Sequence, residues 1–309
     1  MPEQEIIRHP QIDGLHLFLN TIVYRTLHVH PEWELLLVLD EHLIVAYEQQ
    51  EYTIAPGQMV LLSPNQPHGF HKVQEGCTFL CLQMAPRCFP VSEHLCIDGI
   101  CPAEHLTPRE YQWAQGMLLN TMRAYLERPA YYELLCTGNA NLLLHRLLTR
   151  MPTRCMSPNE ADDRAERNAR LVRLIDFVDK NYMHKIQLST FADMENRSMS
   201  YLSHFAKKML NQSFRDYVNT VRFNCACKLI AAGNHRMLDV CMESGFSDYR
   251  YFSKTFQQKV GMTPEAYSRL PQAAVEDERK LHHSLHSKEC FYSREKSLTL
   301  LSQFEAKYR

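Results

Sequence analysis

The sequence lacks three patterns that mark common classes of protein. It contains no run of about 18 apolar residues, which a membrane-spanning helix needs. It does not begin with a basic segment followed by an apolar one, so no signal peptide is indicated. Its 11 cysteines include no CxxC pair and therefore lack the spacing of a zinc site. We expect a cytoplasmic protein with reduced thiols and no membrane contact.

Length and charge suggest two unlike halves. A chain of 309 residues predicts about two domains, and 45% hydrophobic with 22% charged residues is typical of a globular protein. The net charge is −9 over residues 1–163, +7 over residues 164–270 and +1 over residues 271–309. This asymmetry predicts that the basic half alone meets a polyanion.

The first half is patterned as β-structure and then as helix. Short apolar runs such as ELLLVL, QMVLLSP and CTFLCLQM are separated by Pro, Gly, Asn or acidic residues, which favours an antiparallel barrel or sandwich over residues 1–106. Thr107 and Pro108 then begin a helix, and a second helix runs from about Tyr132 to Thr149. We expect a helical hairpin over residues 107–150, whose Leu144 and Leu148 pack on the β domain or on a second copy of the chain.

The second half begins after a linker. Residues 151–165 hold two prolines and few large apolar residues, which predicts the linker. Residues 166–270 have helical periodicity. The tail, residues 271–309, shows little periodicity apart from a short helix near Leu298 to Phe304, and we assign it no role.

Two helix–turn–helix patterns follow each other in the basic half. QLSTFADMEN precedes SMSYLSHFAKKML, and RMLDVCMES precedes the turn GFSD and the helix YRYFSKTFQQKV. Leu202 with Phe205, and Phe252 with Phe256, have the spacing of inward faces. The opposite faces are predicted to meet DNA bases or phosphates, through Ser200, Ser203, His204, Lys207, Arg250, Tyr251 and Lys254.

The stretch GFSDYRYFSKTFQQKVGMTPEAYSRL, residues 245–270, closely resembles the signature of the AraC/XylS family of bacterial transcription regulators. The resemblance extends upstream to residue 169. It implies that Ser200, Ser203, His204, Arg250, Tyr251 and Lys254 face bases or nearby phosphates. His204 stands where the family usually has Arg. Asn211 stands where it usually has Gly, a mild change because Asn tolerates the left-handed conformation at a helix end.

The amino-terminal half resembles the cupin-like sensor domain of many such regulators. HVHPEWE gives an HxHxxxE pattern, and SPNQPH supplies a further histidine. The predicted ligand-binding residues are Tyr24, His28, His30, Trp33, Glu34 and His68, with the two aromatic rings stacking on a sugar. Three interpretations stay open: a metal-free ligand pocket, a metal site formed by His28, His30, Glu34 and His68, and a purely structural barrel.

These observations predict an α+β multidomain chain: an antiparallel β cupin-like barrel with a helical hairpin, followed by an all-α domain with two helix-turn-helix motifs. The expected function is that of a non-enzymatic transcription regulator, an activator by family habit, which is controlled by a small molecule. Its expected partners are double-stranded DNA, the effector, RNA polymerase and a second copy of the chain, with no cofactor. The alternatives are a metal-dependent cupin enzyme fused to a DNA-binding domain and a ligand-independent regulator.

Overall fold

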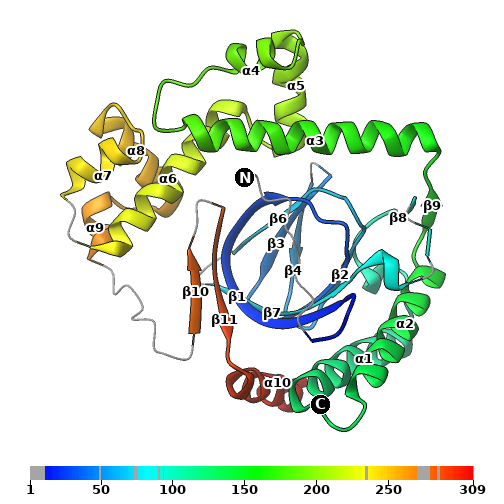
Figure 1. Cartoon of the computed structure of the whole chain (residues 1–309). Coiled ribbons are helices and arrows are strands. Elements are labelled where there is room, and N and C mark those ends of the chain that lie inside the picture. The colour runs from blue at the N-terminus through cyan, green and yellow to red at the C-terminus, as the bar shows by residue number, and fades with distance from the viewer. Residues whose placement is uncertain are drawn as a thin grey trace.

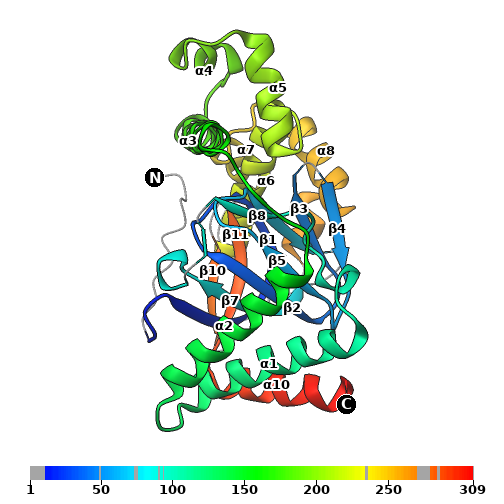
Figure 2. The same ribbon diagram turned by 90° about the vertical axis from the view of Figure 1, so that its right-hand side faces the viewer.

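A computed structural model describes residues 11–48, 50–72, 76–89, 91–92, 94–233, 236–269, 279–283 and 286–308. Its amino-terminal part is an antiparallel sheet curved into a barrel, and its later part is helical (Figures 1 and 2), which confirms the predicted α+β multidomain class. The barrel strands pair in the order β4-β3-β6-β1-β7-β2-β5. Their bounds are β1 Leu15–His28, β2 Trp33–Asp40, β3 Leu43–Tyr47, β4 Gln50–Ile54, β5 Met59–Leu62, β6 His68–Lys72 and β7 Cys77–Met84.

Alternation along each strand separates the barrel interior from an outer apolar face. On β2, Leu36 and Val38 pack inside the barrel, whereas Leu35 and Leu37 join the cluster that includes the helical hairpin. The near-continuous apolar sequence of β2 therefore reflects burial on both faces. Two 3-10 turns, Pro86–Cys88 and Pro102–Glu104, and the small sheet of β8 (Leu95–Ile97) and β9 (Thr153–Cys155) complete this half.

The helical hairpin packs within the chain. Helix α1 (Pro108–Glu127) begins at a capping box in which Thr107 and Glu110 bond each other's backbone amides, and α2 (Tyr132–Arg150) follows it. Leu144 is buried in the cluster shared with the barrel, and Leu148 packs against that cluster. The two leucines thus pack against the β domain, which is one of the two predicted alternatives; the other was packing against a second copy of the chain.

Helix α3 (Pro158–Asn181) begins inside the segment predicted as a linker. Ser157 and Glu160 form a second capping box, which starts the helix well before residue 166. The Ser-Pro-Asn-Glu sequence carried this signal, but its prolines and polar residues were interpreted as linker composition. Figure 1 shows α3 running along the upper side of the barrel, so the second part of the predicted linker, from Pro158 onward, is helical.

The carboxy-terminal helical half, predicted to bind DNA, has two small cores joined by one helix. Its elements after α3 are α4 Leu188–Met194, α5 Met199–Leu210, α6 Phe214–Ala232, α7 Met237–Glu243, α8 Tyr249–Val260 and α9 Pro264–Ser268. Tyr217 and Val221 of α6 belong to the core of the first motif, whereas Phe223 and Ile230 belong to that of the second. Helix α6 therefore fixes the two motifs relative to each other.

The carboxy-terminal tail returns to the barrel. It forms β10 (Arg279–His283), β11 (Ser287–Tyr292) and α10 (Arg294–Tyr308), where the sequence predicted only a short helix. Residues 20–22 of β1 pair with both β7 and β11, so β11 covers the edge of β1 that β7 leaves open. The inward-facing Glu289 accepts hydrogen bonds from Asn20 and Arg25. Because an inward position of β11 is charged, its sequence lacks the alternation of apolar and polar residues that predicts a strand.

Helices α1, α2 and α10 lie at the opposite end of the molecule from the DNA-binding helices (Figure 2). Leu301 and Phe304 of α10 are buried in the core shared by the barrel and the hairpin. None of the helices in the described ranges combines the length and the apolar composition that crossing a bilayer requires.

Candidate functional sites

The first helix–turn–helix motif consists of α4 and α5. Ser198 caps α5 by accepting a hydrogen bond from the Tyr201 amide, and Asn211 ends the helix in the left-handed conformation with φ of 53°. Leu202 and Phe205 are buried as predicted. The remaining face of α5 is exposed and carries the predicted DNA-contacting residues Ser200, Ser203, His204 and Lys207.

The second motif consists of α7 and α8. Gly245 has φ of +85° in the turn, and a Cβ there would lie 2.5 Å from the Tyr182 carbonyl oxygen. Phe246, Phe252 and Phe256 are buried and make edge-to-face ring contacts, which hold α8 in place. Opposite this core lie the exposed side chains Arg250, Tyr251 and Lys254.

Two contacts that the sequence did not predict orient this second motif. Asn219 of α6 donates a hydrogen bond of 2.6 Å to the Tyr251 hydroxyl, which fixes the ring on the exposed face of α8. The Arg222 guanidinium donates to the carbonyls of Tyr182 and His184, at 2.8 and 2.9 Å, beside Gly245. Burial lowers the pKa of Arg222. Both side chains come from α6, and no local sequence pattern distinguishes them from other polar helix residues.

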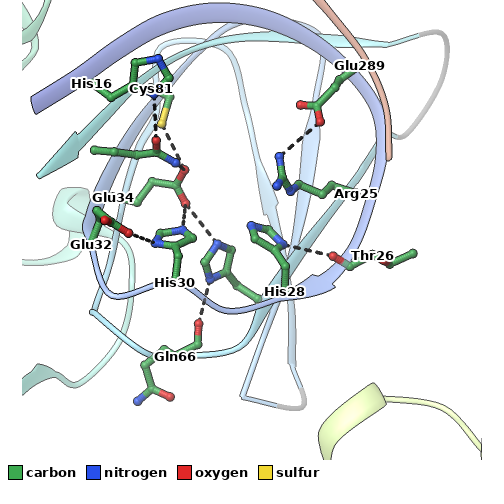
Figure 3. A network of polar contacts seen from close by, with 12 residues as sticks. His16, Arg25, Thr26, His28, His30, Glu32, Glu34, Gln66, Cys81 and Glu289 are labelled. Atoms are coloured by element: carbon green, nitrogen blue, oxygen red, sulfur yellow. Dashed lines mark hydrogen bonds and ion pairs between the residues drawn. The ribbon is translucent and has the colours of Figure 1, made fainter. Parts of the chain in front are cut away.

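Inside the barrel, the predicted histidines and glutamate converge (Figure 3). His28, His30 and His68 are buried, and one ring nitrogen from each lies within 4.8 Å of the others. Glu34 Oε2 lies 3.4 Å from His30 Nε2 and 3.1 Å from His68 Nε2. The end of β1, the loop after it, the start of β2 and the start of β6 therefore bring these four residues to one point, as the resemblance to a cupin-like domain implied.

Surrounding groups orient each member of this cluster. Backbone carbonyls of Thr26 and Gln66 lie 3.1 Å and 2.8 Å from the Nδ1 atoms of His28 and His68, so each Nε2 is directed away from its carbonyl partner. The other oxygen of Glu34 accepts hydrogen bonds from Cys81 Sγ and Gln83 Nε2, both 3.1 Å long. The sequence analysis did not single out these last two residues, although they occupy inward positions of β7.

The electrostatics of the cluster are strongly perturbed. Burial, and then the nearby His68 ring, holds the pKa of His28 well below its usual value, so that ring stays neutral. Burial alone would raise the pKa of Glu34, but hydrogen bonds from His30 and His68 hold it well below the usual range. A carboxylate that stays ionised in a buried site needs a cation or strong donors beside it.

The donor set fits a divalent metal ion. Three imidazoles and one carboxylate are ligands that Zn, Fe, Mn or Ni accept, and the carbonyl-oriented histidines have the outer hydrogen bonds of metal ligands. Both nitrogens of His68 face oxygen atoms, which a neutral ring cannot satisfy by donating a single proton. A proton shared with Glu34, or a metal ion between them, would resolve this contact.

The structure does not bring the two predicted aromatic residues to the cluster. Trp33 precedes Glu34 on β2 and therefore points to the opposite face, where it is buried in the cluster shared with the hairpin. Tyr24 pairs with His71, one position out of phase with inward-facing Phe70. Burial, and then the neighbouring Cys227 thiol of α6, raises its pKa. Neither ring is therefore placed to stack on a ligand beside the histidines.

The loop next to the cluster is hydrogen-bonded to α3. The Asn65 amide donates to the His30 carbonyl at 2.8 Å, and Asn168 of α3 donates to the Asn65 carbonyl at 2.7 Å. Arg164 of α3 donates to the neighbouring Pro64 carbonyl. A continuous path of hydrogen bonds thus connects the histidine cluster to the first helix of the DNA-binding half.

Comparisons with known proteins match both halves. Residues 9–90 match the family model of the AraC-like ligand binding domain, and residues 191–270 match that of a helix-turn-helix domain. The chain is 23% identical over 260 residues to the HTH-type transcriptional regulator YdeC of Bacillus subtilis, covering 80% of this chain and 87% of that protein. A 21% match over 192 residues covers 62% of this chain but only 26% of an HTH-type transcriptional regulator of Staphylococcus aureus.

Two further proteins are similar to this chain over part of its length. The bifunctional transcriptional activator and DNA repair enzyme AdaA of Bacillus subtilis is 28% identical over 97 residues, covering 31% of this chain and 46% of that protein. ToxT from Vibrio cholerae aligns over 83% of this chain and 97% of its own, with a TM-score of 0.41 and 11% identity. By its two domain matches and the agreement with YdeC, the chain belongs to the AraC family of DNA-binding transcriptional regulators, with an AraC-like ligand-binding domain before its helix-turn-helix domain.

Proposed function

We propose that α5 and α8 enter successive major grooves on one face of the DNA, about 34 Å apart. The observation that carries this proposal is the exposed polar face of each helix, opposite a buried aromatic or aliphatic core. Arg250 and Lys254 suit guanine edges, and Tyr251 suits a thymine methyl group or a phosphate. Ser200, Ser203 and His204 read bases or phosphates from α5, and Lys207 contacts phosphate.

Two substitutions test these assignments. Arg250→Ala is expected to relax base preference at one operator position at a cost of about 1–3 kcal/mol. Lys207→Ala is expected to weaken all sequences alike and to reduce the salt dependence of binding. Operator affinities of both variants, measured at several salt concentrations against matched and mismatched sites, distinguish the two effects. If both variants lost affinity in the same way, the assignment of faces would be wrong.

We further propose that a small molecule acts on DNA binding through α3. The hydrogen-bond path from His30 through Asn65 to Asn168 supports this coupling, because a change at the barrel displaces a helix that is rigidly joined to the first motif. Trp33 and Tyr24 lie away from the histidines, so the predicted stacking on a sugar ring has no support from them. On this proposal the bound regulator activates transcription by contact with RNA polymerase.

A homodimer through α2 is also proposed. Leu135 and Leu142 expose 49% and 52% of their surfaces, and a spacing of seven residues places them on one face of the helix. Leu134 beside them is 74% exposed. Leu142→Glu is expected to shift sedimentation of the full chain from dimer to monomer, whereas Asn159→Glu at an exposed position of α3 leaves it unchanged. Equal sedimentation of both variants and wild type would remove this proposal.

We infer that the barrel binds its ligand without catalysis. The similarity to YdeC, an HTH-type transcriptional regulator, supports this inference, and His28, His30 and His68 expose only 5%, 2% and 0% of their surfaces. The metal-like donor set favours one second candidate, a metal-dependent cupin enzyme. Metal analysis of purified wild type and His28→Ala distinguishes the two: near-stoichiometric metal that the variant loses, together with turnover, would establish the enzyme. A regulator that needs no ligand would instead show no response of DNA affinity to any effector.

A further inference from the structure

A cavity lies between the barrel, α3 and α5. Its volume is about 480 Å³, within the range of small-molecule sites. The barrel contributes Tyr47 and Gln66, α3 contributes Arg164 and Arg167, and Lys208 comes from α5. The three histidines do not line it. The cavity is bordered by the barrel from the first half of the chain and by α3 and α5 from the second half.

Arg164 is a buried cation without a carboxylate partner. The residue is 8% exposed, and its guanidinium donates to the Pro64 carbonyl and to the Met156 sulfur. Within the part of the chain that the structure describes, no carboxylate forms an ion pair with it at 4.0 Å or less. Burial lowers its pKa, as expected for a charge that has lost water. An isolated buried charge is costly unless a counter-ion accompanies it.

Tyr47 presents a second donor that lacks an acceptor. The side chain is 2% exposed, and its hydroxyl has no hydrogen-bond partner among the described residues. Burial raises its pKa, so the hydroxyl keeps its proton and remains a donor. The charge of Arg164 also influences the Tyr47 phenol, which places the two donors near each other. A guanidinium without a carboxylate partner and a phenol without an acceptor are both suited to an anionic oxygen.

The other charges around the cavity leave a positive excess. Glu160 pairs with Arg154 at 3.5 Å, so these two charges offset each other. The remaining charged residues of the lining are three cations, Arg164, Arg167 and Lys208, and two exposed carboxylates, Glu48 and Asp163. One negative charge from a ligand would balance the set.

We propose that this cavity is an effector site for a small organic anion, whose carboxylate or phosphate group is bound by Arg164 and Tyr47 and approached by Arg167 and Lys208. The inference deepens the proposed function and rests on it for its regulatory consequence. Lys208 follows Lys207 on the helix proposed to enter the major groove, so an anion held here ties α5 to the barrel. Effector binding and DNA binding then compete for the position of the first motif.

Titration of the full-length chain with inorganic phosphate and with succinate, in the absence of DNA and at ionic strength held constant with chloride, tests the site. Saturable binding of at least one anion is expected at concentrations up to about 10 mM. If only phosphate or only succinate binds, the result shows whether the site prefers a phosphate or a carboxylate group. Tyr47→Phe and Arg164→Gln are each expected to weaken binding by about tenfold or more, because each removes a donor to a charged group.

Matched variants guard against loss of folding and against binding elsewhere. Tyr52→Phe removes a neighbouring hydroxyl that already donates to Gln50, and it should leave anion binding unchanged. Arg173→Gln removes a charge from a second cavity beside α3, which Arg164 also lines but Tyr47, Arg167 and Lys208 do not, so this variant and Tyr47→Phe together distinguish the two cavities. Tyr47→Phe should not lower the melting temperature, since the hydroxyl it removes makes no hydrogen bond within the described chain.

The outcomes separate the site from the regulation. Absence of saturable binding of both anions, or binding that Tyr47→Phe and Arg164→Gln leave unchanged, overturns the site. Binding lost in Arg173→Gln but retained in Arg167→Gln places the anion elsewhere and equally overturns it. Site-dependent binding that does not change operator affinity supports the site and contradicts the coupling in the proposed function.

Discussion

The turn of the second helix–turn–helix motif gives a quantitative test of the structure. Gly245 has φ of +85°, and a Cβ at this position would lie 2.5 Å from the Tyr182 oxygen and 2.8 Å from the Met183 Cα. Both neighbours are backbone atoms, so they cannot move aside as a flexible side chain would. Gly245→Ala should therefore incur two costs, one for the left-handed backbone and one for the steric overlap.

Two other glycines separate these costs. Gly261 has φ of +70°, and an added methyl group there would meet nothing within 4 Å, so Gly261→Ala should lose only about 1 kcal/mol for the left-handed conformation. Gly116 lies within α1 in open space, and Gly116→Ala should gain about 0.5–1 kcal/mol. Overpacking adds about 1–3 kcal/mol, so Gly245→Ala should lose about 2–4 kcal/mol in total.

The assay uses the position of the two tryptophans. Trp33 and Trp113 both lie in the amino-terminal half, so their fluorescence follows the barrel and hairpin, whereas far-ultraviolet circular dichroism also follows the DNA-binding helices. In urea, Gly245→Ala should shift the dichroism transition to lower denaturant and weaken operator binding. A loss no greater than that of Gly261→Ala would refute the close approach of this turn to Tyr182.

Three further predictions concern the tail, the DNA-binding half and the thiols. Leu301→Ala should cost about 2–5 kcal/mol in the tryptophan-detected transition, because α10 is buried against the barrel's core; an unchanged transition would contradict this packing. Hydrogen bonds from Arg173 and Arg170 hold the pKa of Glu195 low. Its stabilisation should therefore be complete above the ordinary pKa of about 4.3 and be lost as pH falls further. Glu195→Gln should remove about 1.5–3 kcal/mol at pH 7 and flatten this acid dependence in dichroism melts. Cys155 is the exposed one of 11 free cysteines, and burial raises the pKa of Cys136 to about 11, so a thiol reagent should label Cys155 rapidly and Cys136 slowly; equal labelling rates at these two sites would contradict the burial of Cys136.

Sequence patterns predicted those elements that short-range chemistry specifies. The fold class, the helical hairpin and both helix–turn–helix motifs follow from apolar periodicity and from caps such as Thr107. The convergence of His28, His30, Glu34 and His68 was instead implied by the resemblance to a cupin-like domain. Helix α3 was missed at its start, although the capping box at Ser157 was present in the sequence.

Other features depend on which face of a strand points inward. Trp33 and Glu34 are adjacent in the sequence, yet a strand directs them to opposite sides, one to the hairpin and one to the histidines. In β1, a register shift between Arg25 and His28 changes the alternation of the side chains. Arg25 therefore lies on the same side as His28, and Tyr24 lies on the outer face. Residue type suggested a ligand-stacking role for both rings, but only the register decides what a strand residue contacts.

The sequence by itself determined most of the helices and strands that precede the carboxy-terminal tail, because capping, periodicity and turn chemistry act over a few residues. Tertiary structure alone decided that β11 covers the edge of β1, that α3 lies along the barrel, and that Tyr47 and Arg164 line one cavity beside α5. These contacts join segments that are far apart in the sequence. Their stabilisation comes from burial and from pairing polar groups that no local pattern records.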